Sequence, residues 1–231
     1  MAALRLLGIE TSSSIFSVAV SSGDEVRSFQ QADGQGPPSL WLTEQIRQAL
    51  EEAGLALADL DGLAVSIGPG SFTGLRVGVV TVKAIAWALK KPVVPISSLE
   101  VAAQNFHERS GTLLAFGDAR KGKVYSALFS AHGSFPVQRR TPDRLTPPEE
   151  ALRGLEGRGI VVFGDGLRRY EGLVRSVLGD AAQAAEPSLW TPRADWLCRI
   201  AQIRWPDSRL DDPHRLVPEY LYSKESDVTG W

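Results

Sequence analysis

The segment Ser71–Leu89 restricts the fold of this chain more than any other part of the sequence. Its residues predict one long helix that ends before Pro92, because proline cannot continue a helix. The helix is apolar on nearly every side, and Arg76, Thr81 and Lys83 are its main polar residues. Such a helix has to be covered on all sides. Either it is a central core helix, or one face packs on its own sheet and the other on a partner subunit.

Short apolar runs surround this helix in the order typical of a layered α/β unit. The patterns predict three successive strands, then a helix, a strand, the long helix and a further strand, at residues 4–9, 16–20, 26–31, 41–53, 63–67, 71–89 and 93–96. The second half repeats this theme more weakly, with strands at 113–117, 124–130 and 160–163 and a β-like tail at 217–222. Thr146 and Glu149 form a capping-box pattern, which predicts a helix start.

These elements predict an α/β protein of two parts. A length of 231 residues allows one large domain or two small ones. We expect an N-terminal subdomain at 1–100, onto which the last helix, near 191–205, folds back. A smaller subdomain follows at 101–190, and residues 206–231 form a C-terminal tail.

Charge and cysteine content exclude several classes of protein. The net charge is −2, from 25 basic and 27 acidic side chains, which argues against a protein whose main role is to neutralise nucleic-acid phosphates. The single cysteine, Cys198, excludes an internal disulfide and a cysteine-based zinc cluster. The N-terminus is too short and polar for a signal peptide, and no uninterrupted apolar run reaches the length of a bilayer span. We therefore expect a cytoplasmic protein.

The most specific motif, Gly68–Arg76, lies between a predicted strand and the long helix. Free backbone N–H groups and the positive end of a helix suit an anion at such a junction. The motif lacks the Gly-Lys-Ser/Thr of a Walker A loop and the glycine spacing of a dinucleotide fingerprint. The alternative interpretation is a closely packed turn. Gly70, Gly74 and Gly78 fall on one helix face, which lets another backbone approach.

Residues suited to catalysis are scarce. The histidines stand apart, at positions 107, 132 and 214, so a histidine-based metal site is not expected. Cys198 lies within an amphipathic helix and is interpreted as a buried small residue. The acidic candidates are Glu10, Asp118 and Asp165, which follow strands, where α/β folds place metal and phosphate chemistry. Carboxylates at these positions are also ordinary turn residues.

Several motifs in this sequence resemble those of the bacterial TsaB (YeaZ) family. They occur in the family's order over nearly the whole chain: Ile9–Ser12, Gly68–Arg76, Gly117–Tyr125, Val162–Gly166 and Pro218–Leu221. The resemblance implies an actin-like ATPase (ASKHA) fold, with two related subdomains whose mixed sheets are flanked by helices, the second subdomain being reduced. Glu10 departs from the family, which usually has Asp at that position.

The resemblance also implies a role in forming N6-threonylcarbamoyladenosine at position 37 of tRNAs that read ANN codons. In that pathway the family supplies a non-catalytic subunit that dimerises with its paralogue TsaD, which holds the metal and transfers the threonylcarbamoyl group. An ATPase, TsaE, joins the complex, and the family member forms homodimers when alone. The resemblance implies no metal, cofactor or membrane of its own and tRNA contact only through the complex. It leaves ATP or ADP open at the partner interface.

Two sets of residues follow from this hypothesis. The expected partner contacts lie along one side of the long helix, with helix 41–53 beside it, so that two helices from each partner form a four-helix bundle. They are Phe72, Arg76, Val79, Val80, Lys83 and Trp87. The residues nearest a bound phosphate would be Glu10, Thr11, Ser12, Gly68, Gly70, Ser71 and Asp118. The alternative function is a stand-alone ATPase or small-molecule kinase of the same superfold, with Glu10 and Asp118 as its carboxylates.

Overall fold

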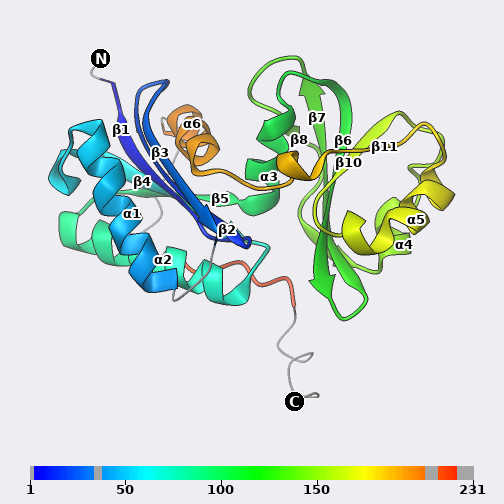
Figure 1. Ribbon diagram of the computed structural model, residues 1–231, viewed down its shortest axis with the longest axis horizontal. Helices are drawn as coiled ribbons and strands as arrows, with labels where there is room; N and C mark the ends of the chain where they lie inside the picture. The colour runs from blue at the N-terminus through cyan, green and yellow to red at the C-terminus, as the bar shows by residue number, and fades with distance from the viewer. Residues whose placement is uncertain (1–2, 34–37, 206–212, 223–231) are drawn as a thin grey trace. The chain divides into compact units, whose positions relative to one another are not determined.

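The computed structural model describes residues 3–33, 38–205 and 213–222, which form two compact units (Figure 1). Unit 1 takes in residues 1–101 and 192–218, and unit 2 takes in residues 102–191 and 219–231. Residues 206–212 and 223–231 of the expected tail lie outside the described residues.

Unit 1 is built on a five-stranded mixed sheet with the order β3-β2-β1-β4-β5. The strands are β1 (Arg5–Glu10), β2 (Ile15–Ser22), β3 (Glu25–Asp33), β4 (Gly62–Gly68) and β5 (Val93–Ser97). The first three form an antiparallel meander, whereas β4 pairs parallel to β1 and β5 pairs parallel to β4. Parallel pairing needs crossover connections, and the helices between β3 and β5 provide them.

Helices cover both faces of this sheet (Figure 1). α1 (Pro38–Ala53) and α2 (Phe72–Leu89) lie on one face and α6 (Ala194–Arg204) on the other, while α3 (Ser98–Ala103) follows β5. The core between the sheet and the first two helices is aliphatic, and includes Leu7, Ile9, Val18, Leu42, Ile46, Val65, Val82 and Ala86.

α2 is also long and apolar enough to cross a membrane, by length and composition alone, with 18 residues and a mean hydropathy of 1.4. No uninterrupted apolar run in the sequence indicates this property, because Arg76 and Lys83 interrupt the helix. Core helices of soluble proteins meet the same criterion, and one face of α2 packs in the core of unit 1.

The close contact between α6 and β1 explains why Cys198, the single cysteine, is buried. A Cβ added at Gly8 would lie 2.9 Å from the Cys198 sulfur and 2.6 Å from the Ala194 carbonyl oxygen, so only glycine lets the helix approach this strand. Complete burial raises the pKa of the Cys198 thiol to about 12. A thiol that stays protonated is a poor nucleophile, which confirms the interpretation of Cys198 as a buried packing residue.

Unit 2 repeats the strand order of unit 1, with two long strands and several very short ones. Its sheet has the order β11-β10-β6-β7-β8, with β9 also paired to β7. The strands are β6 (Ser110–Arg120), β7 (Lys123–His132), β8 (Gln138–Arg139), β9 (Arg144–Thr146), β10 (Ile160–Phe163) and β11 (Gln183–Ala184). Again the first three are antiparallel, as is β9 to β7, whereas β10 pairs parallel to β6 and β11 pairs parallel to β10. The expected pair of related α/β subdomains, the second reduced, is therefore confirmed.

Two local predictions in the second half are wrong. The short strands β8, β9 and β11 were not predicted, and Thr146, expected to cap a helix, instead ends β9. α4 (Pro148–Leu152) begins after Pro147 without a side-chain cap, because proline can occupy the first turn without losing a hydrogen bond. Residues 217–222, expected to be β-like, form no strand, because they pair with no strand of the two sheets that the structure describes. α5 (Leu167–Leu178) follows β10.

Candidate functional site

The glycines of the motif Gly68–Arg76 and of the first turns of α2 pack on the turn that joins β1 to β2. A Cβ added at Gly70 would overlap the carbonyl oxygen of Ser12. At Gly74 it would overlap the carbonyl oxygen of Thr11, and at Gly78 the Thr11 hydroxyl. The sequence analysis predicted that another backbone approaches this helix face, and the structure confirms it.

Hydrogen bonds close this junction from both sides. The Ser71 N–H donates to the Ser12 carbonyl at 2.7 Å, and the Thr11 hydroxyl donates to the Gly74 carbonyl at 2.8 Å. The Ser71 hydroxyl caps α2 by accepting from the Gly74 N–H at 3.2 Å. These donors are already used within unit 1. The geometry supports the close-packing interpretation of the motif, and these residues form no open cradle for a phosphate group.

Glu10, the residue that departs from the family pattern, points into the interior of unit 1. Its side chain is fully buried and accepts hydrogen bonds from the Ser12 N–H at 2.6 Å and from the Ser66 hydroxyl. Burial raises the pKa of this carboxyl above its ordinary value of 4.5, although both hydrogen bonds act in the opposite direction. Ser66 was not among the predicted site residues, although a polar residue within the apolar run of β4 could have indicated it.

As the pH rises from 4.5 to neutral, the ionisation of Glu10 lowers the stability of the wild type, and we expect the variant Glu10→Gln to lose less stability over this range. Because the folded-state pKa is raised, the contribution of Glu10 to stability is full below 4.5 and is lost as the pH rises through the folded pKa. Gln cannot ionise, but it can still accept from the Ser12 N–H. Urea unfolding at pH 4.5 and at about pH 7.5 should show the variant gaining on the wild type as the pH rises. A constant difference would contradict a raised pKa.

Asp118 occupies the corresponding position in unit 2, near the end of the first strand of its sheet. Its carboxylate accepts from the Arg120 N–H at 2.8 Å, and its own N–H donates to the Asp165 carboxylate at 2.8 Å. Arg120 and Lys121 adopt positive φ angles in the tight β6–β7 turn. Both carboxylates thus stabilise turns. Among the described residues, no group of three or more His, Cys, Asp and Glu side chains could hold a metal ion.

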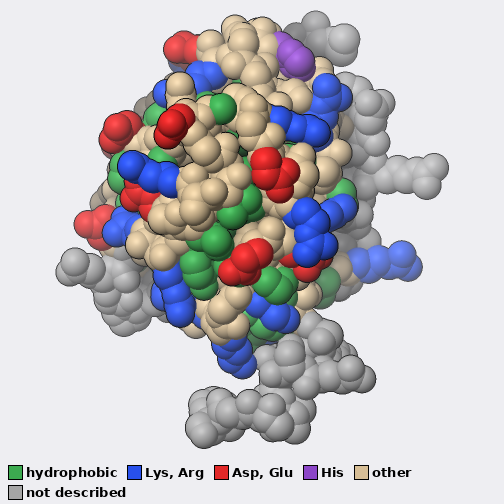
Figure 2. Space-filling view, turned by 90° about the vertical axis from the view of Figure 1, so that its right-hand side faces the viewer, with side chains coloured by type: hydrophobic (Ala, Val, Ile, Leu, Met, Phe, Trp, Pro, Cys, Tyr) green, Lys and Arg blue, Asp and Glu red, His purple; other side chains and the backbone are tan. Residues whose placement is uncertain are grey.

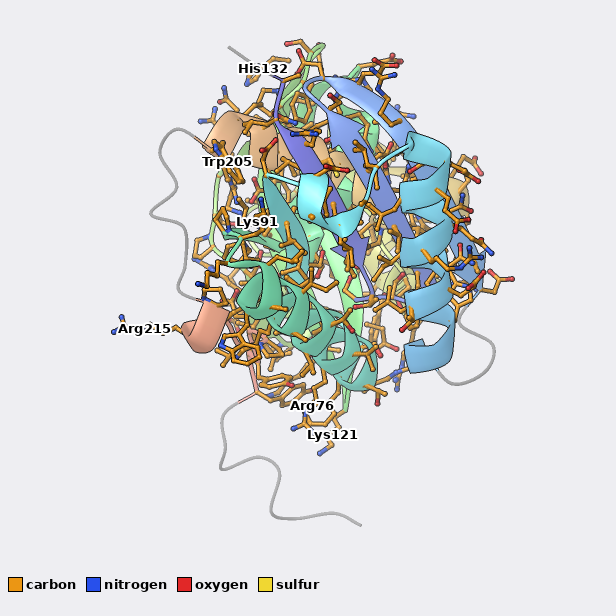
Figure 3. The ribbon with its side chains drawn as sticks, turned by 90° about the vertical axis from the view of Figure 1, so that its left-hand side faces the viewer. Arg76, Lys91, Lys121, His132, Trp205 and Arg215 are labelled. Carbon is orange, nitrogen blue, oxygen red and sulfur yellow. The ribbon has the colours of Figure 1, made fainter. Side chains whose placement is uncertain are left out.

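The outer side of α2 carries large exposed apolar side chains. Phe72, Val80 and Trp87 are 53%, 63% and 68% exposed, and the Arg76 guanidinium stacks on the Phe72 ring at 3.7 Å. We call this surface the α2 face, defined by Phe72, Arg76, Val80, Lys83, Ala84 and Trp87. Figure 3 shows α2 with Arg76 near one end of the helix.

Val79 is a correction to the expected contacts. It is 2% exposed and belongs to the core of unit 1, because it lies on the sheet side of the helix with Val82 and Ala86. A residue buried in this way cannot reach a partner. Of the other expected contacts, Phe72, Arg76, Val80 and Trp87 are exposed and Lys83 is half-buried.

A segment near the C-terminus extends the α2 face. Pro213 lines an open groove with Val80, Lys83, Ala84 and Trp87, and the 3-10 turn Pro213–Arg215 lies beside α2 (Figure 3). The Lys83 ammonium donates to the Leu216 carbonyl at 3.0 Å and Leu216 is buried, whereas Val217 is 64% exposed. The sequence analysis did not find this contact, because no local pattern links residues so far apart in the chain.

Comparison with known proteins supports the resemblance drawn from the motifs. The tRNA threonylcarbamoyladenosine biosynthesis protein TsaB of Bacillus subtilis is 27% identical over 97% of each chain. The crystal structure of YeaZ from Pseudomonas aeruginosa superimposes with a TM-score of 0.82 at 26% identity, covering 94% of this chain and all of that one. The chain belongs to the TsaB (YeaZ) family. The fold of this chain is accordingly that of the YeaZ structure.

Two further likenesses place this TsaB-family chain among its relatives. An uncharacterized protein of Mycobacterium tuberculosis is 40% identical over 78% of this chain and 72% of its own length. Residues 39–145 match the family model of TsaD, the tRNA N6-adenosine threonylcarbamoyltransferase. The matched region contains nearly all of α1 and the whole of α2.

Proposed function

We propose that this chain is a non-catalytic subunit of the complex that forms N6-threonylcarbamoyladenosine at position 37 of tRNAs reading ANN codons, and that it acts by pairing with a TsaD-type catalytic subunit. The observation that carries the proposal is the α2 face. Three large apolar side chains are more than half exposed on one helix, and contiguous apolar surface of this kind is typical of an interaction site.

The similarity to TsaD supports a partner of related fold. The region that matches the TsaD model includes both helices on the α2 side of the sheet. A partner with similar helices presents a similar face, and two such helix pairs pack as a four-helix bundle that buries both apolar surfaces. The same argument supports a homodimer through the α2 face when the partner is absent. TsaE is proposed as a further member of the complex on family grounds.

The state of the candidate catalytic groups supports a subunit without chemistry of its own. Glu10 and Cys198 are buried, and Asp118 is bound into a turn. With a net charge of −2, the chain lacks the basic excess that tRNA binding demands. We therefore propose that the catalytic partner provides most of the tRNA contact.

Reconstitution with the TsaD-type and TsaE-type proteins of the same organism tests this function. We expect no threonylcarbamoylation of unmodified tRNA by this chain alone, and a rate roughly a hundredfold higher when it joins the other two than when it is omitted, because an assembled site positions its reactants. Equal rates with and without the chain would refute the proposal. Light scattering of the chain, alone and mixed with the TsaD-type subunit, measures the homodimer and the heterodimer directly.

The alternative of a stand-alone ATPase or small-molecule kinase makes a different prediction. Such an enzyme has to bind ATP·Mg²⁺ without a partner. We expect calorimetry on the isolated chain to show no ATP·Mg²⁺ binding, because the Ser71 N–H and the Thr11 hydroxyl at the β4–α2 junction donate to carbonyls within unit 1. Saturable binding would favour the alternative.

A further inference from the structure

A small pocket in unit 2 has a lining that the proposed function does not use. It lies against β7, β9 and α4, and its volume is about 90 Å³. This is the space of roughly three water molecules, well below the volume of sites for drug-sized ligands. Leu114, Leu128 and Leu155 supply apolar walls. An occupant of this pocket can therefore place only a few heavy atoms inside it.

One residue of the pocket lining has a hydroxyl that secondary structure leaves unused. Thr146, predicted to cap a helix, instead pairs with Val124 in the β7–β9 ladder and lines the pocket. Its hydroxyl has no hydrogen-bond partner among the residues that the structure describes, and it is enclosed by neighbouring atoms, with almost no accessible surface. A ligand in the pocket therefore does not reach this hydroxyl, and its binding depends on the other lining side chains.

Two arginines line the same pocket, and their guanidinium groups are uncommitted. Within the described part of the chain, neither Arg144 nor Arg153 forms a side-chain hydrogen bond or an ion pair, whereas Arg175 in the same unit pairs with Glu171 at 2.8 Å. A guanidinium presents a planar set of N–H donors that matches the oxygens of a carboxylate or a phosphate. Glu150 also lines the pocket, so two positive charges and one negative leave a net charge of +1, which suits a monoanion.

We propose that this pocket binds a small oxyanion, a carboxylate or phosphate group, between Arg144 and Arg153. The surface of unit 2 that carries α4 and α5 favours a short ligand over a polyanion, because its basic and acidic side chains are interspersed around apolar ones (Figure 2). The proposal does not depend on the function proposed above, since the pocket shares no residue with the α2 face.

Titration of the full chain with sodium phosphate and with sodium acetate, at constant ionic strength, tests this site. We expect saturable shifts of the backbone amide resonances of Ser126–Leu128, of Thr146 and of Glu149–Ala151 in two-dimensional NMR with at least one of the two anions. The stronger anion identifies the ligand group as phosphate or carboxylate. Shifts no larger than those from sodium chloride with both anions would refute the proposal.

Variants assign the binding to this pocket. The double substitution Arg144→Ala, Arg153→Ala should weaken binding by roughly a hundredfold, since charge-assisted bonds are the strong ones. The double substitution Lys121→Ala, Arg158→Ala removes the same charge from unit 2 outside the pocket and should leave binding unchanged. The dispersion of each spectrum reports whether the variant is folded. Equal affinity in the Arg144/Arg153 variant and the wild type would overturn the proposal.

Discussion

Val80→Asp should prevent this chain from joining a TsaD-type subunit while leaving its own fold intact. Val80 is 63% exposed on α2, so in the free chain the new carboxylate stays in water and changes stability by about 0.5 kcal/mol or less. In the proposed complex the same carboxylate would be buried among apolar side chains without a partner. Burial of an unpaired charge costs about 3 to 5 kcal/mol, which corresponds to a loss of at least roughly a hundredfold in affinity.

Titration calorimetry with the TsaD-type subunit measures this loss, and thermal unfolding of the free variant shows that the fold is kept. Ile203→Asp is the matched control, because Ile203 is 50% exposed on α6, which lies on the opposite face of the same sheet. We expect the control to bind as the wild type does. If Val80→Asp bound equally well, or if only Ile203→Asp failed to bind, the α2 face would not be the interface.

The contrast between Val79 and Val80 shows how far the sequence can predict this site. A helix over Ser71–Leu89 and the close approach at its glycines follow from local spacing, and the structure confirms both. Two adjacent valines are chemically identical, and only the position of the sheet decides that one is buried and the other exposed. That position depends on the packing of α2 on β4, which no local pattern contains.

Long-range pairs escaped prediction for the same reason. Ser66 reaches Glu10 across 56 positions, and Lys83 reaches Leu216 across 133. The order of strands and helices was predictable because β1, β2, β4 and β5 are each a run of mostly apolar residues, and β3 follows β2 after a tight turn. The strands β8 and β11 have two residues each, too few to show a period, and exist only because a longer strand lies beside them.

Gly74→Ala should be among the most destabilising single substitutions in this protein. The added Cβ would overlap the carbonyl oxygen of Thr11, which belongs to the backbone and cannot move away as a side chain would. Overpacking of this kind costs about 3 kcal/mol. Gly172→Ala is the matched control, because Gly172 lies in α5 with no atom near its Cβ position, and alanine there should stabilise the helix by up to about 1 kcal/mol. Urea unfolding measures both changes, and equal effects would contradict the packing described here.

A double-mutant cycle separates close packing from a general intolerance of α2 to alanine. At Gly78 the added Cβ meets the Thr11 hydroxyl, a side-chain atom, and Thr11→Ala removes it. Thr11→Ala alone should cost about 1 kcal/mol, since it loses the hydrogen bond to the Gly74 carbonyl. In that background we expect Gly78→Ala to be less costly by about 1 to 2 kcal/mol than in the wild type. Gly74→Ala should gain no such relief, because its obstacle is a backbone oxygen that every residue at position 11 retains. Equal relief at both glycines would mean that α2 shifts as a whole, and the motif Gly68–Arg76 would then need another explanation.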